Sequence, residues 1–390
     1  MNRFATPWGE LALARFPEDP RDQLRAWDAS DEYLLRYLAG EELKGIEHPA
    51  PVDLSGEVVV VGDRWGALAV ALAERRPTQI VDSFLGRSAT TANLARNGVA
   101  ADAVRLLTTR DPVPARIDVL LVRVPKSLAL LEDQLHRLAP ALHPGTVVVG
   151  TGMVTEIHTS TLELFERLVG PTRTSLAVRK ARLILATPDP ALVRPANPWP
   201  HSYPLPEGVG PVSGRTVVNH AGVFCAERLD IGTRFLLEHL PERSGPDRVV
   251  DLGCGNGVLG TAAALANPAA EPLFVDESFQ AVASAEATFR AALGAERTAG
   301  FRVGDGLDGV PSGSADLVLN NPPFHSHQAT TDAVAWRMFT GARRVLRPGG
   351  ELWVVGNRHL GYHVKLRKIF GGCETVAANP KFVILRAVRR

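Results

Sequence analysis

The two halves of the chain repeat one pattern of strands and helices, and this repeat limits the possible folds more than any other feature. Residues 248–252 form a short apolar run that leads into a glycine-rich turn at 253–257 and an alanine-rich helical segment at 258–266. Residues 58–73 repeat this order, and later segments correspond at offsets of 191 to 204 residues. Short apolar runs that alternate with helical patterns are typical of parallel βαβ sheets. The sequence therefore predicts an internal duplication of one doubly wound α/β domain.

A proline-rich segment separates the two halves. Eight prolines fall within residues 188–211, a density that neither a helix nor a central strand can contain. We therefore expect an extended linker here, between an N-terminal domain over 1–187 and a C-terminal domain over 212–390.

The composition favours a folded protein of a reducing compartment. With 45% hydrophobic and 22% charged residues, each half can bury a complete core. The three cysteines are widely spaced and form neither a disulfide framework nor a C-x-x-C zinc motif. No apolar run reaches the roughly 18–20 residues that cross a membrane, and residues 1–5 lack the apolar core of a signal peptide. We expect a cytoplasmic protein with no membrane partner and no metal site.

The turn at 253–257 has the pattern Gly-x-Gly-x-Gly, between a strand that carries Asp251 and a helix. Glycine adopts a positive φ without strain, and its missing Cβ lets a ligand lie against the backbone. A dinucleotide site would require glycine at position 258, where the chain has Val258. The turn therefore favours a nucleoside with an amino-acid tail over a pyrophosphate, although a turn with only a structural role has the same pattern.

Two acidic residues follow the next two strands. Asp276 ends an apolar strand 23 residues after Gly253, where a carboxylate can bind both hydroxyls of a ribose. Asp305 lies in a Gly-Asp-Gly sequence, where its carboxylate can accept a hydrogen bond from an adenine amino group. The alternatives are a helix cap after the first strand and a plain β-turn at Gly-Asp-Gly.

The most specific motif is Asn-Pro-Pro-Phe, which follows an apolar strand at 316–320. Two successive prolines lack N–H donors, so the backbone from Pro322 presents carbonyl oxygens. Asn321 adds a side-chain acceptor and Phe324 an aromatic face, and the three together predict a receptor for a planar NH2 group. His325 and His327 follow, but a His-x-His pair on a loop more often faces solvent or RNA than acts as a base.

These motifs resemble those of class I S-adenosylmethionine-dependent N-methyltransferases. Residues 223–225 (Val-Phe-Cys) and 229–233 (Leu-Asp-Ile-Gly-Thr), taken with the Asn-Pro-Pro-Phe motif, are similar to the ribosomal RNA guanine-N2 methyltransferases of the RsmC and RlmG kind. The tail over 356–382 is most similar to the large-subunit, RlmG branch. The resemblance implies an α/β fold of two tandem Rossmann-like methyltransferase domains, of which the N-terminal copy is degenerate.

The resemblance also implies the reaction and its residues. We expect transfer of a methyl group from the cofactor S-adenosylmethionine to N2 of a guanine in ribosomal RNA, with the large subunit preferred. Asn321, Pro322 and Phe324 would be the catalytic residues. The residues implied to bind the cofactor are Asp230, Thr233, Asp251, Gly253, Gly255, Asn256, Gly257, Asp276, Asp305 and Asn321. Nothing in the sequence indicates a protein partner.

The first half lacks these features. Arg64 and Trp65 stand where the second half has Gly255 and Asn256, and Arg123 and Lys126 fall in the segment that corresponds to Asn-Pro-Pro-Phe. A former active site lined by cations would bind RNA phosphates rather than a cofactor. The alternative is sequence drift without a new role.

Several other functions remain possible from the sequence alone. An NH2 receptor of this kind also fits glutamine amides and the N6 group of adenine, and the target RNA could belong to the small subunit. Residues 337–390 hold twelve Lys and Arg against two Glu, which favours a nucleic acid as substrate, although a solvated helix face is the alternative. An inactive ribosome-assembly factor is disfavoured by the complete motifs, and an NAD-dependent oxidoreductase by Val258.

Overall fold

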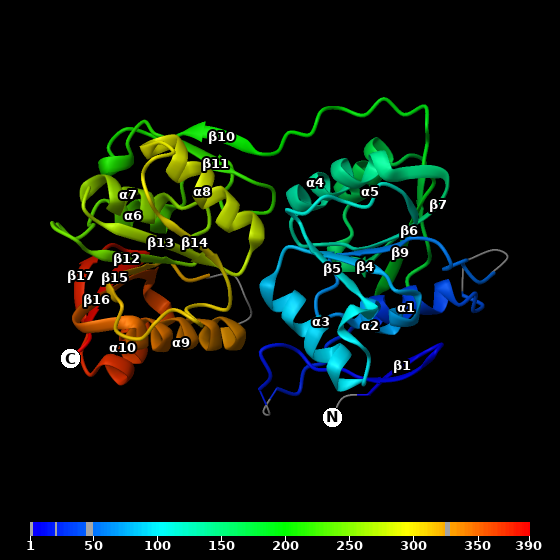
Figure 1. The fold of residues 1–390 in the computed structure, drawn as a ribbon, viewed down its shortest axis with the longest axis horizontal. Helices are drawn as coiled ribbons and strands as arrows, with labels where there is room; N and C mark the ends of the chain where they lie inside the picture. The colour runs from blue at the N-terminus through cyan, green and yellow to red at the C-terminus, as the bar shows by residue number, and fades with distance from the viewer. Residues whose placement is uncertain (1–2, 20–21, 44–49, 324–327) are drawn as a thin grey trace. The chain divides into compact units, whose positions relative to one another are not determined.

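The chain forms two compact units, Met1–Pro198 and Trp199–Arg390 (Figure 1). The computed structural model describes residues 3–19, 22–43, 50–323 and 328–390. Within these residues, no helix is both long and apolar enough to cross a membrane. Each unit is an α/β domain built on one seven-stranded sheet.

The sheet of the second unit has the strand order β14-β13-β12-β15-β16-β18-β17. The first five strands of this order are parallel, and β18 runs antiparallel to both of its neighbours. The strands are β12 (Arg248–Leu252), β13 (Glu271–Asp276), β14 (Gly300–Val303), β15 (Ala315–Asn320), β16 (Leu346–Asn357), β17 (Glu374–Ala378) and β18 (Phe382–Val388).

The first unit repeats this order as β5-β4-β3-β6-β7-β9-β8, which confirms the predicted duplication. Its strands are β3 (Val58–Val61), β4 (Thr78–Val81), β5 (Arg105–Thr108), β6 (Ile117–Arg123), β7 (Leu142–Met153), β8 (Thr172–Thr174) and β9 (Ala181–Ala186). The register is also repeated, because Val61 lies opposite Val122 as Leu252 lies opposite Asn320. Arg123 therefore occupies the position that Asn321 has in the second unit.

Helices cover both faces of each sheet (Figure 1). In the first unit α1 (Ala29–Leu38) and α2 (Ala67–Ala71) pack on one face, and α4 (Leu128–Leu138) and α5 (Thr159–Leu168) on the other. In the second unit α9 (Gln328–Val345) and α10 (Tyr362–Phe370) pack on one face, and α6 (Ile231–Leu237) and α7 (Val258–Ala266) on the other.

The remaining elements complete these layers. Helix α3 (Phe84–Arg96) follows β4, and α8 (Phe279–Leu293) follows β13 at the corresponding place. A hairpin of β1 (Arg3–Thr6) and β2 (Gly9–Ala12) precedes α1. The short 3-10 helices are η1 (Ala73–Arg75), η2 (Ala101–Ala103), η3 (Ala139–Ala141), η4 (Val154–Glu156), η5 (Gly210–Val212) and η6 (Arg358–Leu360).

Only the first part of the proline-rich segment, before β10, connects the two units. Strand β10 (His201–Pro204) pairs antiparallel with β11 (Thr216–Asn219) in the second unit, and Leu205 and Val209 are buried in that unit's core. The expected linker over 188–211 is therefore too long at its C-terminal end. Its apolar residues between the prolines gain more from burial than from an extended, solvated chain.

In each unit a buried aspartate accepts a hydrogen bond from the helix that follows the first strand of the sheet. Asp251 accepts from the Gly260 N–H at 2.8 Å, and Asp63 accepts from the Ala69 N–H at 2.9 Å. Burial raises the pKa of Asp251 to about 7 and that of Asp63 to about 6, although hydrogen bonds from the helix oppose the shift. Both helices thus start over a carboxyl group that is protonated at a higher pH than an exposed aspartate.

This shift predicts a pH dependence of the second unit's stability. The pKa of Asp251 rises from 3.8 to about 7 on folding, so the folded state holds a proton that the unfolded state has lost between these values. The unfolding free energy should therefore fall as pH rises from about 4 to about 7, by up to about 4 kcal/mol at about 1.4 kcal/mol per pKa unit.

Urea denaturation at pH 5 and pH 8 measures this dependence, with hydrogen-exchange mass spectrometry of β12 peptides reporting on the second unit. Asp251→Asn should remove most of the dependence, whereas substitution of the exposed Asp308 by Asn should keep it. A wild-type dependence that persists in Asp251→Asn would assign the effect to another group.

Candidate active site

The glycine-rich turn connects the end of β12 to the start of α7 through three glycines with positive φ. The φ angles are +70° at Gly253, +52° at Gly255 and +77° at Gly257, as the sequence predicts. A Cβ on Gly257 would lie 2.6 Å from the Cα of Ala285 in α8, so this glycine allows the two helices to pack. A Cβ on Gly255 would meet nothing within 4 Å, so the turn is open to a ligand at that residue.

Asp276, at the end of β13, lies beside this turn. One carboxylate oxygen accepts from the Gly255 N–H at 3.0 Å, and the other accepts from the Ser278 N–H at 3.1 Å. Both oxygens are thus held at the edge of the turn by backbone N–H groups. The structure thus brings together Gly255 and Asp276, two of the residues predicted to bind the cofactor.

Two other predicted cofactor residues are engaged within the protein. The amide of Asn256 donates to Oδ1 of Asn219 at 3.0 Å, which ties the turn to the end of β11. Asp305 forms an ion pair with Arg337 of α9 at 2.8 Å through its Oδ2 atom. Burial raises the pKa of Asp305, and the charge of Arg337 opposes this effect. Sequence analysis missed Arg337 because it belongs to a helix 32 residues further along the chain.

Asn321 is held by the first turn of α6. Its Nδ2 atom donates to Oδ2 of Asp230 at 3.0 Å and to Oγ1 of Thr233 at 2.9 Å. Asp230 is the N-cap of α6 and also accepts from the Thr233 N–H at 2.8 Å. An ionised carboxylate can only accept hydrogen bonds, so the NH2 end of the Asn321 amide must face Asp230.

This orientation leaves a buried acceptor without a partner. Oδ1 of Asn321 is inaccessible to solvent and has no hydrogen-bond partner among the described residues. Oδ1 of the preceding Asn320 is in the same condition, because that amide uses its nitrogen to donate to the Leu252 carbonyl at 2.7 Å. An unpaired buried polar atom costs about 1–3 kcal/mol. An unsatisfied acceptor directly after the end of β15 indicates a ligand that donates hydrogen bonds.

The rest of the Asn-Pro-Pro-Phe motif is described in part. Pro322 is buried and Pro323 is exposed. Phe324, His325 and His327 lie outside the described residues, so the expected aromatic face stays a prediction. No group of three or more His, Cys, Asp or Glu in the described part of the chain is arranged to hold a metal ion.

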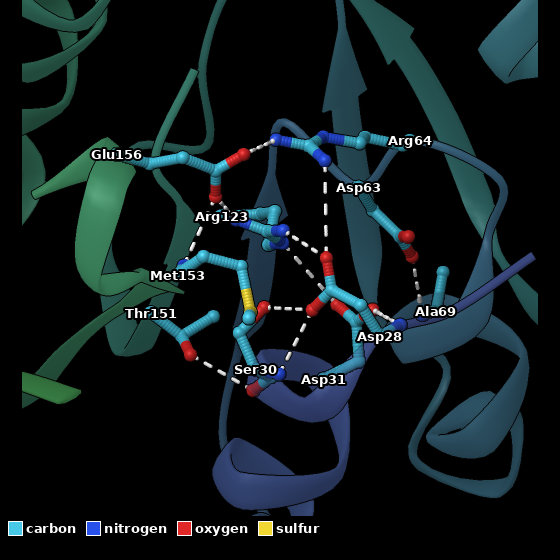
Figure 2. A network of polar contacts seen from close by, with 10 residues as sticks. All are labelled: Asp28, Ser30, Asp31, Asp63, Arg64, Ala69, Arg123, Thr151, Met153 and Glu156. Atoms are coloured by element: carbon cyan, nitrogen blue, oxygen red, sulfur yellow. Dashed lines mark hydrogen bonds and ion pairs between the residues drawn. The ribbon is translucent and has the colours of Figure 1, made fainter. Parts of the chain in front are cut away.

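The corresponding position in the first unit is filled by a buried arginine (Figure 2). Arg123 is 1% exposed, and its guanidinium donates to Asp28 at 2.6 Å and to Glu156 at 2.9 Å. Its Nε atom lies 3.5 Å from a carboxylate oxygen of Asp31. Figure 2 shows the guanidinium between these three carboxylates. The charge of Arg123 is thus neutralised inside the unit.

A second arginine joins the same network. Arg64 donates to Glu156 at 2.6 Å and lies 3.8 Å from Asp28. Burial alone would raise the pKa of Glu156, but the charges and hydrogen bonds of Arg123 and Arg64 lower it to about 2. Burial is the largest effect at Asp31 and raises its pKa to about 7, although Arg123 opposes the shift.

The prediction of a cation-lined face at this place is therefore wrong for Arg123, which is buried and paired. Carboxylates from the start of α1 and from η4 pair with Arg123, and local sequence patterns do not predict that these distant segments meet there. Lys126 is exposed, and its contact with RNA stays a prediction.

The comparisons with known proteins agree with the two-unit fold. The family model described as "RLMG N-terminal domain" matches residues 1–190, and that described as "Methyltransferase small domain" matches residues 214–386. The chain is 74% identical over 384 residues to ribosomal RNA large subunit methyltransferase G of Streptomyces coelicolor, covering 98% of this chain and 99% of that protein. The protein of the same name from Pseudomonas aeruginosa is 51% identical over 388 residues, covering 99% of this chain and 100% of that protein.

A solved structure shares the fold over the whole chain. It is the 16S rRNA N2 G1207 methyltransferase (RsmC) of T. Thermophilus, in complex with AdoMet and guanosine. The TM-score is 0.74 at 21% sequence identity, with 100% of this chain and 98% of that chain covered. The similarity confirms an α/β fold with two tandem methyltransferase-like domains.

The buried network predicts a large cost for Arg123→Ala. This change would leave Asp28, Asp31 and Glu156 without their shared counter-charge, and loss of one partner of a buried ion pair typically costs about 3–5 kcal/mol. The matched control is Arg179→Ala, because Arg179 pairs with Glu32 at 2.7 Å but is 74% exposed. An exposed pair contributes at most about 1 kcal/mol.

Urea denaturation of both variants, with hydrogen exchange of β6 peptides as the probe of the first unit, tests this prediction. Equal, small losses in the two variants would contradict a structural role for the network. A folded Arg123→Ala protein that binds ribosomal RNA more weakly would restore Arg123 as an RNA contact.

Proposed function

The chain belongs to the family of ribosomal RNA large subunit methyltransferase G, and from this premise we propose that it methylates N2 of a guanine in large-subunit RNA. It is an S-adenosylmethionine-dependent rRNA methyltransferase, as its relatives and its methyltransferase domain indicate. The single observation that carries the choice of an amino group is the unpaired, buried Oδ1 of Asn321. The relatives' names favour the large subunit over the small one.

The residues at the glycine-rich turn fit S-adenosylmethionine. Gly255 leaves the backbone open to the ligand, and the carboxylate of Asp276 beside it can accept from ribose hydroxyls. Asp305 uses one oxygen for Arg337, so its Oδ1 atom remains for an adenine amino group. When bound, S-adenosylmethionine supplies an electrophilic methyl group on a positively charged sulfur.

We assign supporting roles to four other predicted cofactor residues. Asp230 and Thr233 hold the amide of Asn321, Asp251 fixes the start of α7, and Asn256 ties the turn to Asn219. These contacts fix the shape of the site rather than bind the cofactor directly.

Asn321 would orient the guanine amino group for reaction. The lone pair of guanine N2 is delocalised into the ring, which makes this nitrogen a poor nucleophile. An N–H donated to Oδ1 of Asn321, with a second donated to the Pro322 carbonyl, would fix the direction of that lone pair. Most of the rate acceleration would then come from positioning and oriented dipoles.

The Asp230–Thr233 pair makes this orientation definite. The amide of an asparagine without fixed partners can rotate by about 180°, which swaps the positions of its oxygen and nitrogen. Here the carboxylate and the hydroxyl both take hydrogen bonds from Nδ2, so only the oxygen can face the substrate. An amide held this way selects a donor such as NH2 and disfavours an acceptor such as a ring nitrogen.

Asn321→Ala should lower kcat by about 10²–10³, the typical cost of removing one polar contact made to the reacting group. The affinity for S-adenosylmethionine should stay within a few-fold. Thr233→Val, which removes one of two contacts to Nδ2, should give a smaller loss, and Thr233→Ser should be close to wild type. Transfer of labelled methyl groups to unmodified 23S rRNA measures turnover.

Mass spectrometry of the nucleosides then identifies the product. N2-methylguanosine supports the proposal, whereas methylated adenosine or a methyl group on a ring nitrogen would contradict it. An Asn321→Ala protein with near wild-type turnover would remove Asn321 from the mechanism.

The glycines of the turn predict two separable effects. Gly255→Ala and Gly257→Ala each place a side chain at a positive φ, which costs about 1–2 kcal/mol. Gly257→Ala adds a clash with the Ala285 backbone and should destabilise the second unit further. Gly255→Ala should keep the fold but weaken S-adenosylmethionine binding at least tenfold, because its Cβ enters the open space over the turn.

Isothermal titration calorimetry and urea denaturation of the two variants measure these effects. Wild-type affinity in a folded Gly255→Ala protein would place the cofactor elsewhere.

A further inference from the structure

A groove with a basic lining lies between α9, α10 and the C-terminal end of the second unit. It has a volume of about 500 Å³. Arg343 and Arg344 line it from α9, Lys368 from α10, and Arg389 from the residue after β18. These four residues belong to the basic segment over 337–390, and none of them has a role in the proposed active site.

The four cations of this groove have no acidic partner among the described residues. Other arginines of the same segment do have one: Arg337 pairs with Asp305, Arg347 with Asp316, and Arg386 with Glu351. The groove therefore gathers four cations of the segment whose charge no carboxylate of the described residues cancels. An uncompensated cluster of cations attracts a polyanion.

Two of these cations are fixed in place by backbone carbonyls. Arg344 donates to the carbonyl oxygens of Leu307 at 2.5 Å and Val310 at 2.7 Å. Arg389 donates to the carbonyls of Arg344, at 3.1 Å, and Leu346. These bonds hold the guanidinium groups without neutralising them, so binding an anion there would cost less side-chain entropy than at a free arginine.

An aromatic side chain completes the lining. Trp336 is 37% exposed, and the ammonium group of Lys368 lies 5.3 Å from its ring centroid. Trp336, Thr340 and Arg343 are spaced by four and three residues, so they share one face of α9. A ring next to fixed cations is the combination that binds a nucleic-acid strand, with stacking or sugar contact at the ring and phosphates at the cations.

The same helix connects this groove to the active site. Helix α9 follows the Asn-Pro-Pro-Phe segment, and its Arg337 pairs with Asp305 at the proposed adenine position. Arg344 lies seven residues further along α9 than Arg337, or about 10 Å at about 1.5 Å per residue. The groove therefore begins about two helical turns along α9 from the Arg337–Asp305 ion pair.

We propose that this groove binds the phosphate backbone of the substrate rRNA, with Trp336 against a base or sugar. The proposal rests on the proposed function, because it takes rRNA as the substrate. It assigns affinity and register to the groove, whereas the choice of the amino group stays with Asn321.

The test compares the wild-type chain with Arg343→Gln/Lys368→Gln. Binding to unmodified 23S rRNA transcript, measured over a range of salt concentrations, should weaken at least tenfold. The slope of log K against log salt should fall by roughly 1.4–1.8, for two lost phosphate contacts at roughly 0.7–0.9 each. The apparent KM for rRNA should rise, whereas kcat at saturating rRNA and the affinity for S-adenosylmethionine should stay close to wild type.

Two further variants separate the contributions. Arg215→Gln/Arg248→Gln removes the same net charge from exposed positions of the second unit outside the groove, and it should keep the wild-type affinity and slope. Trp336→Leu should weaken binding several-fold without changing the salt slope, since it removes a ring and no charge. An equal loss in the arginine control would mean that only net charge matters and would overturn the proposal.

The remaining outcomes are also decisive. Suppose that Arg343→Gln/Lys368→Gln keeps the wild-type rRNA affinity, salt slope and methylation activity. This result would overturn the proposal that the groove binds rRNA and would not affect the proposed function. A wild-type chain that does not methylate 23S rRNA would instead contradict the proposed function. Displacement of rRNA by poly-glutamate as readily as by poly-uridylate of equal charge would indicate a docking surface for acidic protein and would overturn RNA as the occupant.

Discussion

Each unit depends on one polar contact between a strand end and a helix start. The strand is β15 in the second unit and β6 in the first, and the helix is α6 or α1, which precedes the sheet in the chain. In the second unit Asn321 binds Asp230 and Thr233 of α6, and in the first unit Arg123 binds Asp28 and Asp31 of α1. The N-cap carboxylate satisfies a free helix N–H in both units and also fixes the residue at the strand end. The position of Asn321 and Arg123 therefore follows from helix capping. The helix needs such a cap whether or not the strand end carries a functional residue.

The two units differ in what this contact leaves unsatisfied. An amide has donors and an acceptor, so Asn321 can give its nitrogen to the helix and keep its oxygen for a ligand. A guanidinium has five donors and no acceptor, and it needs carboxylates on several sides. Glu156 of η4 supplies one, at the third residue after β7, where the second unit has the apolar Leu360 after β16. The first unit thus closes its former site from within, and the second unit leaves it incomplete without a substrate.

Local patterns predicted most of the fold, and contacts between distant segments account for what they missed. The strand, turn and helix around Gly255 follow from apolar runs and glycine positions, and the structure has them at the predicted residues. The repeat also placed Arg123 correctly at the position of Asn321. Its burial could not be predicted, because Asp28 lies 95 residues earlier in the chain and Glu156 33 residues later. The contact of Asp230 with Asn321 could not be predicted for the same reason, since it spans 91 residues.

The number of charged residues in a segment also does not predict where net charge lies on the folded protein. The segment over 337–390 is strongly basic as a sequence, but the fold places Asp305 against Arg337 and Asp316 against Arg347. The groove, in contrast, has a positive local field from Arg343, Arg344, Lys368 and Arg389. Because α9 is one continuous helix, its length fixes the distance between this field and Asp305. In the proposed complex one rigid helix therefore sets how far the phosphates bound in the groove lie from the cofactor pocket beside Asp305.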